Sequence, residues 1–301
     1  MLPWFTERYL QIIDRLLKQK LHHALLLSGP AGIGKYELAI TLAKVILCRN
    51  PTARGCCETC QSCLLFDAST HPDFYALVSE KQLGVDKIRE GIGKLSGMSQ
   101  LGANKVLVIP AADLITESAA NALLKTLEEP TNKTFIILLT AKAQHLLPTI
   151  LSRCEKHFFS TPAPAQSLKW LKGNGVDDVT PALLEAYGNA PLRLKQALTN
   201  ESGISYREFC DGFDALLAGK KDALSLANDW QEYAVQVVSW VQQFTHKSFL
   251  QSQQVQDYQN FQVCVDALKS LMHPGINKAV VLCAVLDTIA NPEHQRTRNI
   301  K

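Results

Sequence analysis

The chain has 301 residues, of which 47% are hydrophobic and 20% are charged, proportions that are ordinary for a soluble globular protein. This length is enough for two or three domains. The formal net charge of +3 at pH 7 is too small to argue for nucleic-acid binding by itself. The start of the chain carries early charges, and no stretch approaches the roughly 20 apolar residues of a membrane span. We therefore expect no signal peptide, no membrane helix and a cytoplasmic location.

Helical and strand patterns alternate along the first half of the chain. Amphipathic or apolar periodicity predicts helices over residues 7–20, 35–47, 85–98 and 116–129. Short apolar runs predict strands over residues 22–28, 74–79, 105–109, 135–140 and 155–159. Strands that alternate with helices predict an α/β fold with a doubly wound, mainly parallel sheet. Ligands of such sheets bind where the strands end.

The strand pattern stops at the linker Thr161-Pro162-Ala163-Pro164-Ala165. We expect a P-loop domain over residues 1–161, with a cysteine-rich insert at 48–66. Short helical patterns broken by glycines predict a small helical lid domain over residues 162–203. Residues 204–301 read as helical and form the third expected domain.

A glycine-rich loop follows the first expected strand and opens the next helix. Gly29, Gly32 and Gly34 precede Lys35, and the pattern matches G-x-x-x-x-G-K-[ST] except at its last position, Tyr36. Backbone N–H groups of such a loop bind phosphates, and the lysine adds positive charge. The hydroxyl missing at Tyr36 normally ligates Mg²⁺. The loop is therefore a degenerate nucleotide site, either binding ATP or ADP or conserving only the loop's shape.

The strand over residues 105–109 lacks the acids that an ATPase places directly after it. Pro110 and Ala111 stand there instead, and the nearest acid is Asp113. Water attack on a phosphoryl group needs Mg²⁺ and a positioned carboxylate. The residues therefore favour a chain without ATPase activity of its own. An ATP-hydrolysing chain in which Asp113 replaces the missing acid stays open.

Two polar residues are candidates for contacts with nucleotide phosphates. Thr140 ends the fourth expected strand, where it could sense a γ-phosphate or simply satisfy nearby backbone groups. Arg193 could reach phosphates from the second domain or lie on a solvated helix face.

Four cysteines give the strongest chemical signal. Cys48, Cys57, Cys60 and Cys63 follow the spacing C-x8-C-x2-C-x2-C, which suits a closed tetrahedral structural Zn²⁺ site. A set of reduced free thiols is the alternative. Cys56 is surplus to this spacing, and the later Cys210, Cys264 and Cys283 fall in helical patterns typical of core positions.

Several motifs together resemble bacterial clamp-loader subunits of the AAA+ class. They are the glycine loop, the four-cysteine insert, His71-Pro72-Asp73, Val85-Asp86-Lys87-Ile88-Arg89, the segment Asn121 to Pro130, and Ser152-Arg153-Cys154. The resemblance covers roughly residues 20–200. It implies that residues 204–301 form the helical collar domain through which these subunits oligomerise.

The resemblance implies that this chain takes a place in a ring with gamma/tau and delta subunits. This ring uses ATP to load a sliding clamp on primer–template DNA and is part of a DNA-directed DNA polymerase holoenzyme. Gamma/tau subunits keep the catalytic residues that this chain lacks. A lone arginine at a helix end is usually a surface residue, but the resemblance implies that Arg153 acts as an arginine finger in trans. A zinc-module nucleic-acid binder with an inactive P-loop is the remaining alternative.

Overall fold

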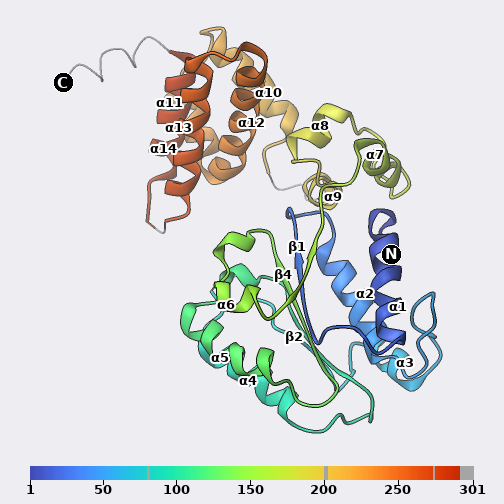
Figure 1. Cartoon of the computed structure of the whole chain (residues 1–301). Coiled ribbons are helices and arrows are strands. Elements are labelled where there is room, and N and C mark those ends of the chain that lie inside the picture. Colours follow the sequence, from blue (N-terminus) through green and yellow to red (C-terminus); the bar gives the residue numbers. More distant parts are fainter. Residues whose placement is uncertain (80–81, 200–202, 274, 292–301) are drawn as a thin grey trace. The chain divides into compact units, whose positions relative to one another are not determined.

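A five-stranded sheet organises the amino-terminal part of the chain (Figure 1). The computed structural model describes residues 1–79, 82–199, 203–273 and 275–291. The strands follow the order β2-β3-β4-β1-β5, and every pairing is parallel. Their bounds are Ala24–Ser28 (β1), Phe74–Ala76 (β2), Lys105–Ile109 (β3), Thr134–Thr140 (β4) and Glu155–Phe158 (β5). The predicted doubly wound parallel sheet is thereby confirmed.

The register of the strands defines two opposite edges of the sheet. Leu25 of β1 lies beside Ile137 of β4 and Glu155 of β5, and Ser28 lies beside Thr140. The ends of β1, β3 and β4 therefore form one edge, called here the carboxyl rim. Their beginnings form the opposite edge, called here the amino rim.

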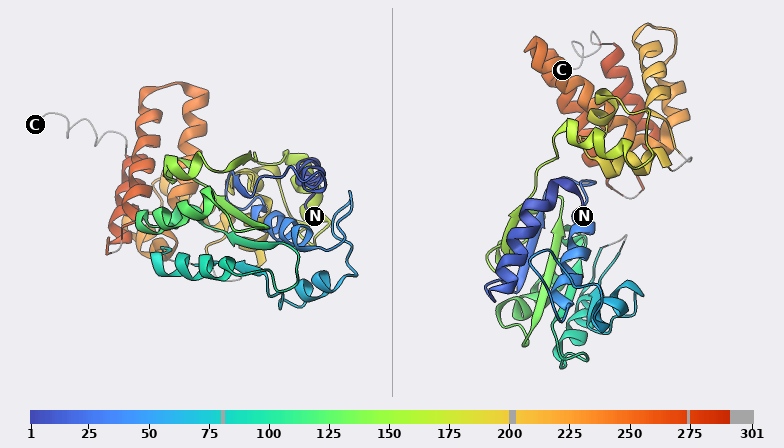
Figure 2. Two further views of the ribbon diagram at one scale, coloured as in Figure 1. Left: turned by 60° about the horizontal axis from the view of Figure 1, so that its bottom comes forward. Right: turned by 90° about the vertical axis from the view of Figure 1, so that its right-hand side faces the viewer.

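Helices cover both faces of the sheet (Figure 2). Because side chains alternate along a strand, Leu25 and Leu27 pack against α1 and α2, and Leu26 packs in the opposite layer with α4, α5 and α6. The strands β1 and β3 are buried throughout, as expected for central strands of a parallel sheet. The helix bounds in this part are Thr6–Leu17 (α1), Lys35–Leu47 (α2), Gln61–Asp67 (α3), Val85–Ser96 (α4), Glu117–Glu128 (α5), Pro148–Leu151 (α6), Pro164–Lys172 (α7) and Pro181–Ala186 (α8).

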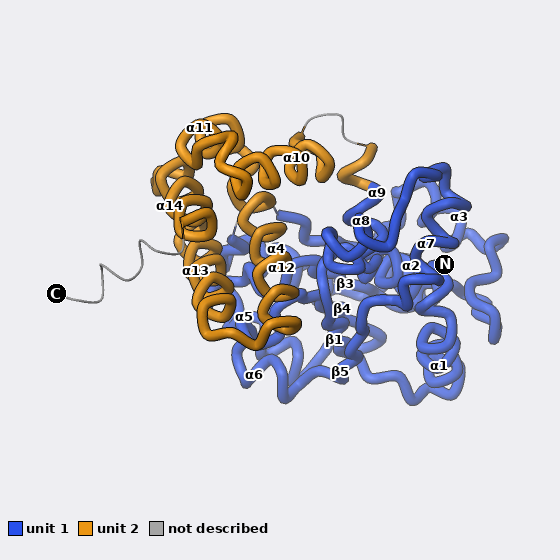
Figure 3. The backbone as a smooth tube through the Cα atoms, turned by 90° about the horizontal axis from the view of Figure 1, so that it is seen from above, with its two compact units in different colours: residues 1–195 blue, residues 196–301 orange. Residues whose placement is uncertain are grey.

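The chain divides into two compact units, residues 1–195 and 196–301 (Figure 3). Helix α9 (Pro191–Thr199) contains the division. The described part of the second unit is helical, and in its aromatic core Phe209 stacks on Phe213 and makes tilted contacts with Trp230 and Trp240. No helix in the described part of the chain is both long and apolar enough to cross a bilayer. The helices of this unit are Tyr206–Leu217 (α10), Ala223–Trp230 (α11), Ala234–Ser252 (α12), Val255–Leu271 (α13) and Lys278–Ala290 (α14).

Some elements are shorter than their periodicity predicts. Helix α1 ends at Leu17 rather than residue 20, because Gln19 adopts a left-handed conformation and the Lys20 amide donates back to the Arg15 carbonyl. Helix α4 ends at Ser96, where Gly97 is extended. Strand β2 ends at Ala76. The helix predicted after Thr116 is present, and the Thr116 hydroxyl accepts from the Ala119 amide.

Candidate functional site

The glycine loop connects β1 to α2 at the carboxyl rim, where ligands of parallel sheets bind. Gly29, Gly32 and Gly34 all have positive φ, at 152°, 76° and 95°. Residues that carry a Cβ rarely adopt these backbone conformations, so the turn depends on glycine. The Lys35 ammonium donates to the carbonyls of Gly29 and Pro30, both at 2.7 Å, and so holds the loop closed.

Two segments of the first unit pack directly on this loop. The Trp4 indole donates to the Ile33 carbonyl at 2.8 Å, and a Cβ placed on Gly34 would meet the Leu2 side chain at 2.0 Å. On another side, the Leu192 amide donates to the Gly32 carbonyl at 3.0 Å. The start of α9 therefore touches the loop through its backbone, and the amino-terminal segment covers the loop's second half.

Arg193 packs against the glycine loop at Gly32. A Cβ on Gly32 would lie 2.5 Å from the Cβ of Arg193. The positive charge of Arg193 also acts on the Tyr187 hydroxyl, whose pKa is raised mainly by burial. The contact with phosphates predicted for Arg193 stays a prediction.

Asp113 and Thr140 meet beside the loop lysine. The Thr140 hydroxyl donates to the Asp113 carboxylate at 2.9 Å and accepts from the Lys142 amide at the same distance. Burial lowers the pKa of Lys35 to about 8, and the nearby negative charge of Asp113 opposes that shift. The structure thus brings together the three residues that the sequence named separately, although Thr140 already has two local partners.

The loop keeps the glycines and the lysine of a phosphate-binding loop but lacks ligands for the Mg²⁺ that hydrolysis needs. Its left-handed glycines and buried lysine have the form that cradles phosphates. In contrast, Tyr36 is 40% exposed and places its hydroxyl at the end of a ring, where Ser or Thr would hold one beside the backbone. Pro110 and Ala111, which follow β3, supply no oxygen ligand from their side chains.

Arg153 lies at the opposite edge of the sheet from the loop. Leu25 and Glu155 are register partners, so Arg153, two residues before Glu155, is about level with His23 at the amino rim. Gly29 lies six positions after His23, which corresponds to about 20 Å of strand. The arginine is therefore too far from the loop of its own chain to contact a phosphate bound there.

Glu128 of α5 holds Arg153 in place. The Arg153 Nε donates to the Glu128 carboxylate at 2.6 Å, and its Nη1 donates to the Thr149 carbonyl at 3.0 Å. The two side chains remain 32% and 48% exposed. Exposed ion pairs contribute only about 0–1 kcal/mol, so this contact orients the guanidinium without fixing it permanently.

The four cysteines of the predicted metal site gather into one cluster that could hold a metal ion. The sulfur atoms of Cys48, Cys57, Cys60 and Cys63 all lie within 4.8 Å of one another. Neighbouring sulfurs are 3.5 Å apart for Cys48–Cys57 and Cys60–Cys63, and 3.9 Å apart for Cys48–Cys60. Four thiolates at 2.3 Å from a tetrahedral Zn²⁺ lie about 3.8 Å apart, so the donor set is compatible with zinc.

Backbone amides prepare this cluster for a cation. The Thr59 amide, followed by the Cys60 amide, donates to the Cys57 sulfur and lowers its pKa to about 6. The Cys57 amide in turn donates to the Cys48 sulfur at 3.3 Å. The sulfur of Cys56 does not join the cluster, and its side chain packs against the apolar core instead. Of the other cysteines, Cys264 is fully buried as predicted, while Cys210 and Cys283 are only partly buried.

His71 and Ser62 connect the cysteine insert to the sheet. The Asp73 amide donates to His71 Nδ1 at 3.1 Å, so the ring carries its proton on Nε2 and donates to Ser62 Oγ at 2.7 Å. Ser62 Oγ donates onward to the Leu47 carbonyl at 2.6 Å, at the end of α2. Ser62 lies between two metal-site cysteines, so this chain of hydrogen bonds fixes the insert against the fold.

Comparisons with known proteins show the family of this chain. A family model described as "DNA polymerase III, delta subunit" matches residues 6–163. The chain is 37% identical over 234 residues to a Pseudomonas aeruginosa protein named DNA polymerase III subunit delta', covering 76% of this chain and 70% of that one. The chain belongs to the delta-prime subunit family of DNA polymerase III. The predicted resemblance to bacterial clamp-loader subunits is thereby confirmed at the level of this family.

Further comparisons concern relatives of the delta-prime family and its fold. The Escherichia coli protein of the same name is 39% identical over 172 residues, covering 56% of this chain and 52% of its own length. A crystal structure of a DNA polymerase III gamma subunit-related protein from Thermotoga maritima aligns with a TM-score of 0.51 and 19% identity, covering 94% of this chain and 99% of that one. This second likeness supports the fold alone: an AAA+ P-loop domain and a helical carboxyl-terminal region.

Sequence reasoning missed the partners that hold the delta-prime site residues. Leu2 and Trp4 cover the loop, Glu128 orients Arg153, and Ser62 and His71 anchor the insert. The sequence did carry a signal for Leu2 and Trp4, because apolar residues directly before a helix often pack back on the core. The others depend on contacts between distant parts of the sequence.

Proposed function

We propose that this chain is a non-hydrolysing subunit of the DNA polymerase III clamp loader. In this role it joins gamma/tau and delta subunits in the cytoplasm and supports ATP-driven loading of the sliding clamp on primer–template DNA. Membership of the delta-prime family supports the assembly. The side chains of Tyr36, Pro110 and Ala111 support the lack of hydrolysis, because none offers Mg²⁺ the ligand that its position normally supplies.

The proposal also assigns Arg153 a role in trans, as an arginine finger for a neighbouring subunit's nucleotide. The observation that carries this assignment is the register of β5, which places Arg153 about level with His23 and far from the loop of its own chain. A guanidinium can neutralise charge on a transferring phosphoryl group without other catalytic groups in its own subunit. The contacts with Glu128 and the Thr149 carbonyl hold the guanidinium beside the end of α6 until a partner phosphate competes.

Two structural assignments belong to the same proposal. The cysteine cluster holds a structural Zn²⁺, because four sulfurs leave no coordination position for a substrate. The P-loop domain takes residues 1–161, the lid domain residues 162–203 and the collar residues 204–301, so the division between the two compact units falls inside the lid domain.

The test is ATP turnover by the reconstituted loader with Arg153→Ala in this chain. Arginine fingers contribute on the order of 10³–10⁵ in rate at the site they serve, so turnover at the facing site should be almost abolished. Lys156→Ala, an exposed cation three residues away, is the matched control and should leave turnover unchanged. Size-exclusion chromatography checks that the assembly is intact. Unchanged turnover in an intact Arg153→Ala assembly would refute the role in trans.

One observation favours a second candidate, an ATP-hydrolysing subunit with degenerate motifs. Asp113 lies close enough to Lys35 to influence its pKa, and it is held there by Thr140. Asp113 could then stand in for the acids missing after β3. Mg²⁺-dependent turnover by the purified chain, abolished by both Asp113→Asn and Lys35→Ala, would establish this alternative. No turnover above that of the Lys35→Ala variant would exclude it.

A further inference from the structure

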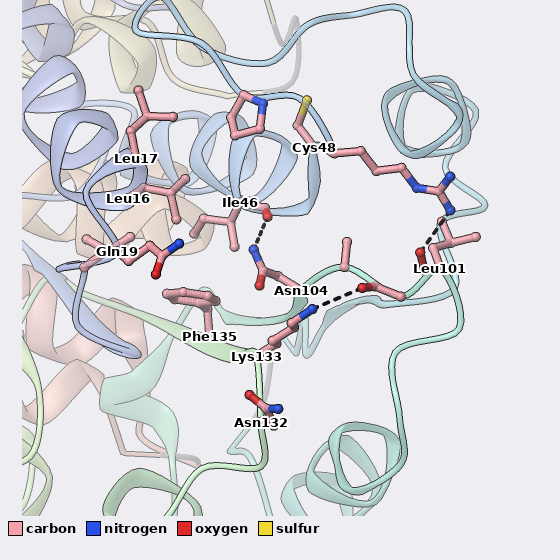
Figure 4. Close-up of a pocket in the computed structure, with 15 residues that line it drawn as sticks. Leu16, Leu17, Gln19, Ile46, Cys48, Leu101, Asn104, Asn132, Lys133 and Phe135 are labelled. Atoms are coloured by element: carbon pink, nitrogen blue, oxygen red, sulfur yellow. Dashed lines mark hydrogen bonds between the residues drawn. The ribbon is translucent and has the colours of Figure 1, made fainter.

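A pocket of about 710 Å³ opens at the amino rim, away from the glycine loop (Figure 4). Its walls come from the end of α1, the end of α2, and the loops that lead into β3 and β4. Its volume is within the range of about 300–1,000 Å³ that is typical of ligand sites. The lining residues that matter below are Leu16, Leu17, Ile46, Arg49, Lys133 and Phe135.

The pocket combines an apolar side with a cationic rim. Leu16 and Leu17 lie side by side in Figure 4, and Phe135 lies next to Lys133, apart from the two leucines. Arg49 adds a second cation, and the amides of Gln19, Asn104 and Asn132 complete the polar lining. No Asp or Glu is among the lining residues. The pocket therefore suits a ligand with apolar groups and negative charge.

The pocket walls are held in place by contacts that need no ligand. The Asn104 side chain donates to the Ile46 carbonyl at 2.6 Å, which ties the start of β3 to the end of α2. The buried Asp73 carboxylate accepts from the amides of Gln100 and Leu101 at 2.8 and 3.0 Å. A ligand would therefore meet a largely preformed surface, which reduces the entropy cost of binding.

The cysteine cluster supports one wall. Cys48 lines the pocket, and Arg49 directly follows it. The Arg49 backbone amide donates to the Cys60 sulfur, while its guanidinium donates to the Leu101 carbonyl at 2.9 Å. The position of this cation thus depends on the same segment that the four cysteines organise.

We propose that this amino-rim pocket binds a short extended segment of a partner protein that carries apolar side chains next to carboxylates. The apolar side would receive one or two large side chains, and Arg49 and Lys133 would pair with the acids. Single-stranded nucleic acid fits less well, because it uses several exposed aromatic rings for stacking, and the lining offers only the half-buried Phe135. The proposal rests neither on ATP hydrolysis nor on the role of Arg153.

The experiment is selection of a random-peptide phage library on the zinc-loaded full chain, followed by fluorescence anisotropy with labelled synthetic copies of the enriched peptides. Leu17→Glu and Arg49→Glu alter the two sides of the pocket at exposed positions, so folding should survive. We expect enriched sequences that combine acidic with aromatic or aliphatic residues. Each variant should weaken their binding at least tenfold, and rising ionic strength should weaken it further.

Two control variants match these changes outside the pocket. Leu10→Glu alters α1 two turns earlier, at a leucine that is 43% exposed against 41% for Leu17. Lys87→Glu reverses an exposed cation on α4. Neither should change peptide affinity. The proposal is overturned if no peptide is enriched, or if enriched peptides bind the pocket variants as tightly as they bind the unmodified chain. It is also overturned if the pocket variants lose affinity for a labelled single-stranded oligonucleotide but not for the peptides.

Discussion

Replacing Ser62 with alanine tests how the cysteine insert is fixed to the fold. The Ser62 side chain is 1% exposed, and its hydroxyl is the hydrogen-bond partner of both His71 Nε2 and the Leu47 carbonyl. The substitution removes no metal ligand and leaves a space too small for a water molecule. Both polar groups should therefore remain buried without a partner.

The expected loss follows from these two groups. A buried polar group without a partner costs about 1–3 kcal/mol, so the first unit should lose about 2–6 kcal/mol. Because whole domains are stable by only about 5–15 kcal/mol, this is a large effect. A loss of 2 kcal/mol corresponds to a change of about 30-fold in the opening equilibrium.

Hydrogen exchange measured by mass spectrometry is the suitable assay, because it reports on the first unit within the full chain. Amides of β1 and β4 should exchange at least about 30-fold faster in Ser62→Ala. Ser96→Ala removes an exposed hydroxyl that donates to the Gly93 carbonyl and should change exchange by less than about 0.5 kcal/mol. The double variant with His71→Phe should lose less than the sum of the single losses, because both residues share one hydrogen bond. Equal exchange in Ser62→Ala and Ser96→Ala would refute the reasoning.

Three further predictions concern the loop, the metal and the second unit. Lys35 has a pKa of about 8 in the folded chain against 10.5 when unfolded, so it should titrate near pH 8 in NMR spectra of the ¹³C-dimethylated chain, and a midpoint above 10 would contradict this. Between these two pKa values the unfolded state binds more protons than the folded state. The free energy of unfolding, measured relative to that of Lys35→Met, should therefore rise from pH 8 to 10.5. Chelating zinc should speed hydrogen exchange across residues 48–66 while peptides containing Arg153 stay unchanged, and equal protection with and without chelator would count against the metal site. Gly212→Ala should destabilise the second unit by about 1–3 kcal/mol in exchange measurements on α10 and α11, because the new Cβ would lie 2.5 Å from Trp230. Gly93→Ala, where nothing lies within 4 Å, should instead stabilise its helix by about 0.4–1 kcal/mol, and a similar effect at both glycines would show that packing at Trp230 does not matter.

Local patterns were enough to predict the sheet and the gathering of four cysteines into one cluster. Apolar runs at β1, β3 and β4 are long enough to identify buried strands, and the loop at Gly29 locates the edge where they end. The spacing of the cysteines restricts their sulfurs to one small volume, which the structure confirms. In each case the information lies within a few neighbouring residues.

Contacts between distant residues could not be predicted in this way. His71 precedes β2 and Leu47 ends α2, so their link through Ser62 exists only after the sheet has formed. The pairing of Arg153 with Glu128 likewise joins residues that are 25 positions apart. Periodicity defines which face of an element is buried but not which polar side chain meets which carbonyl across the fold.

The short strands also define the distance between the two edges of the sheet. Strand β1 has five residues, which span about 16 Å at 3.3 Å per residue. A nucleotide bound by the glycine loop and a segment that enters the amino-rim pocket would therefore lie at opposite ends of the same sheet. The sheet would then act as a spacer of fixed length, so that occupation of one site leaves the geometry of the other unchanged.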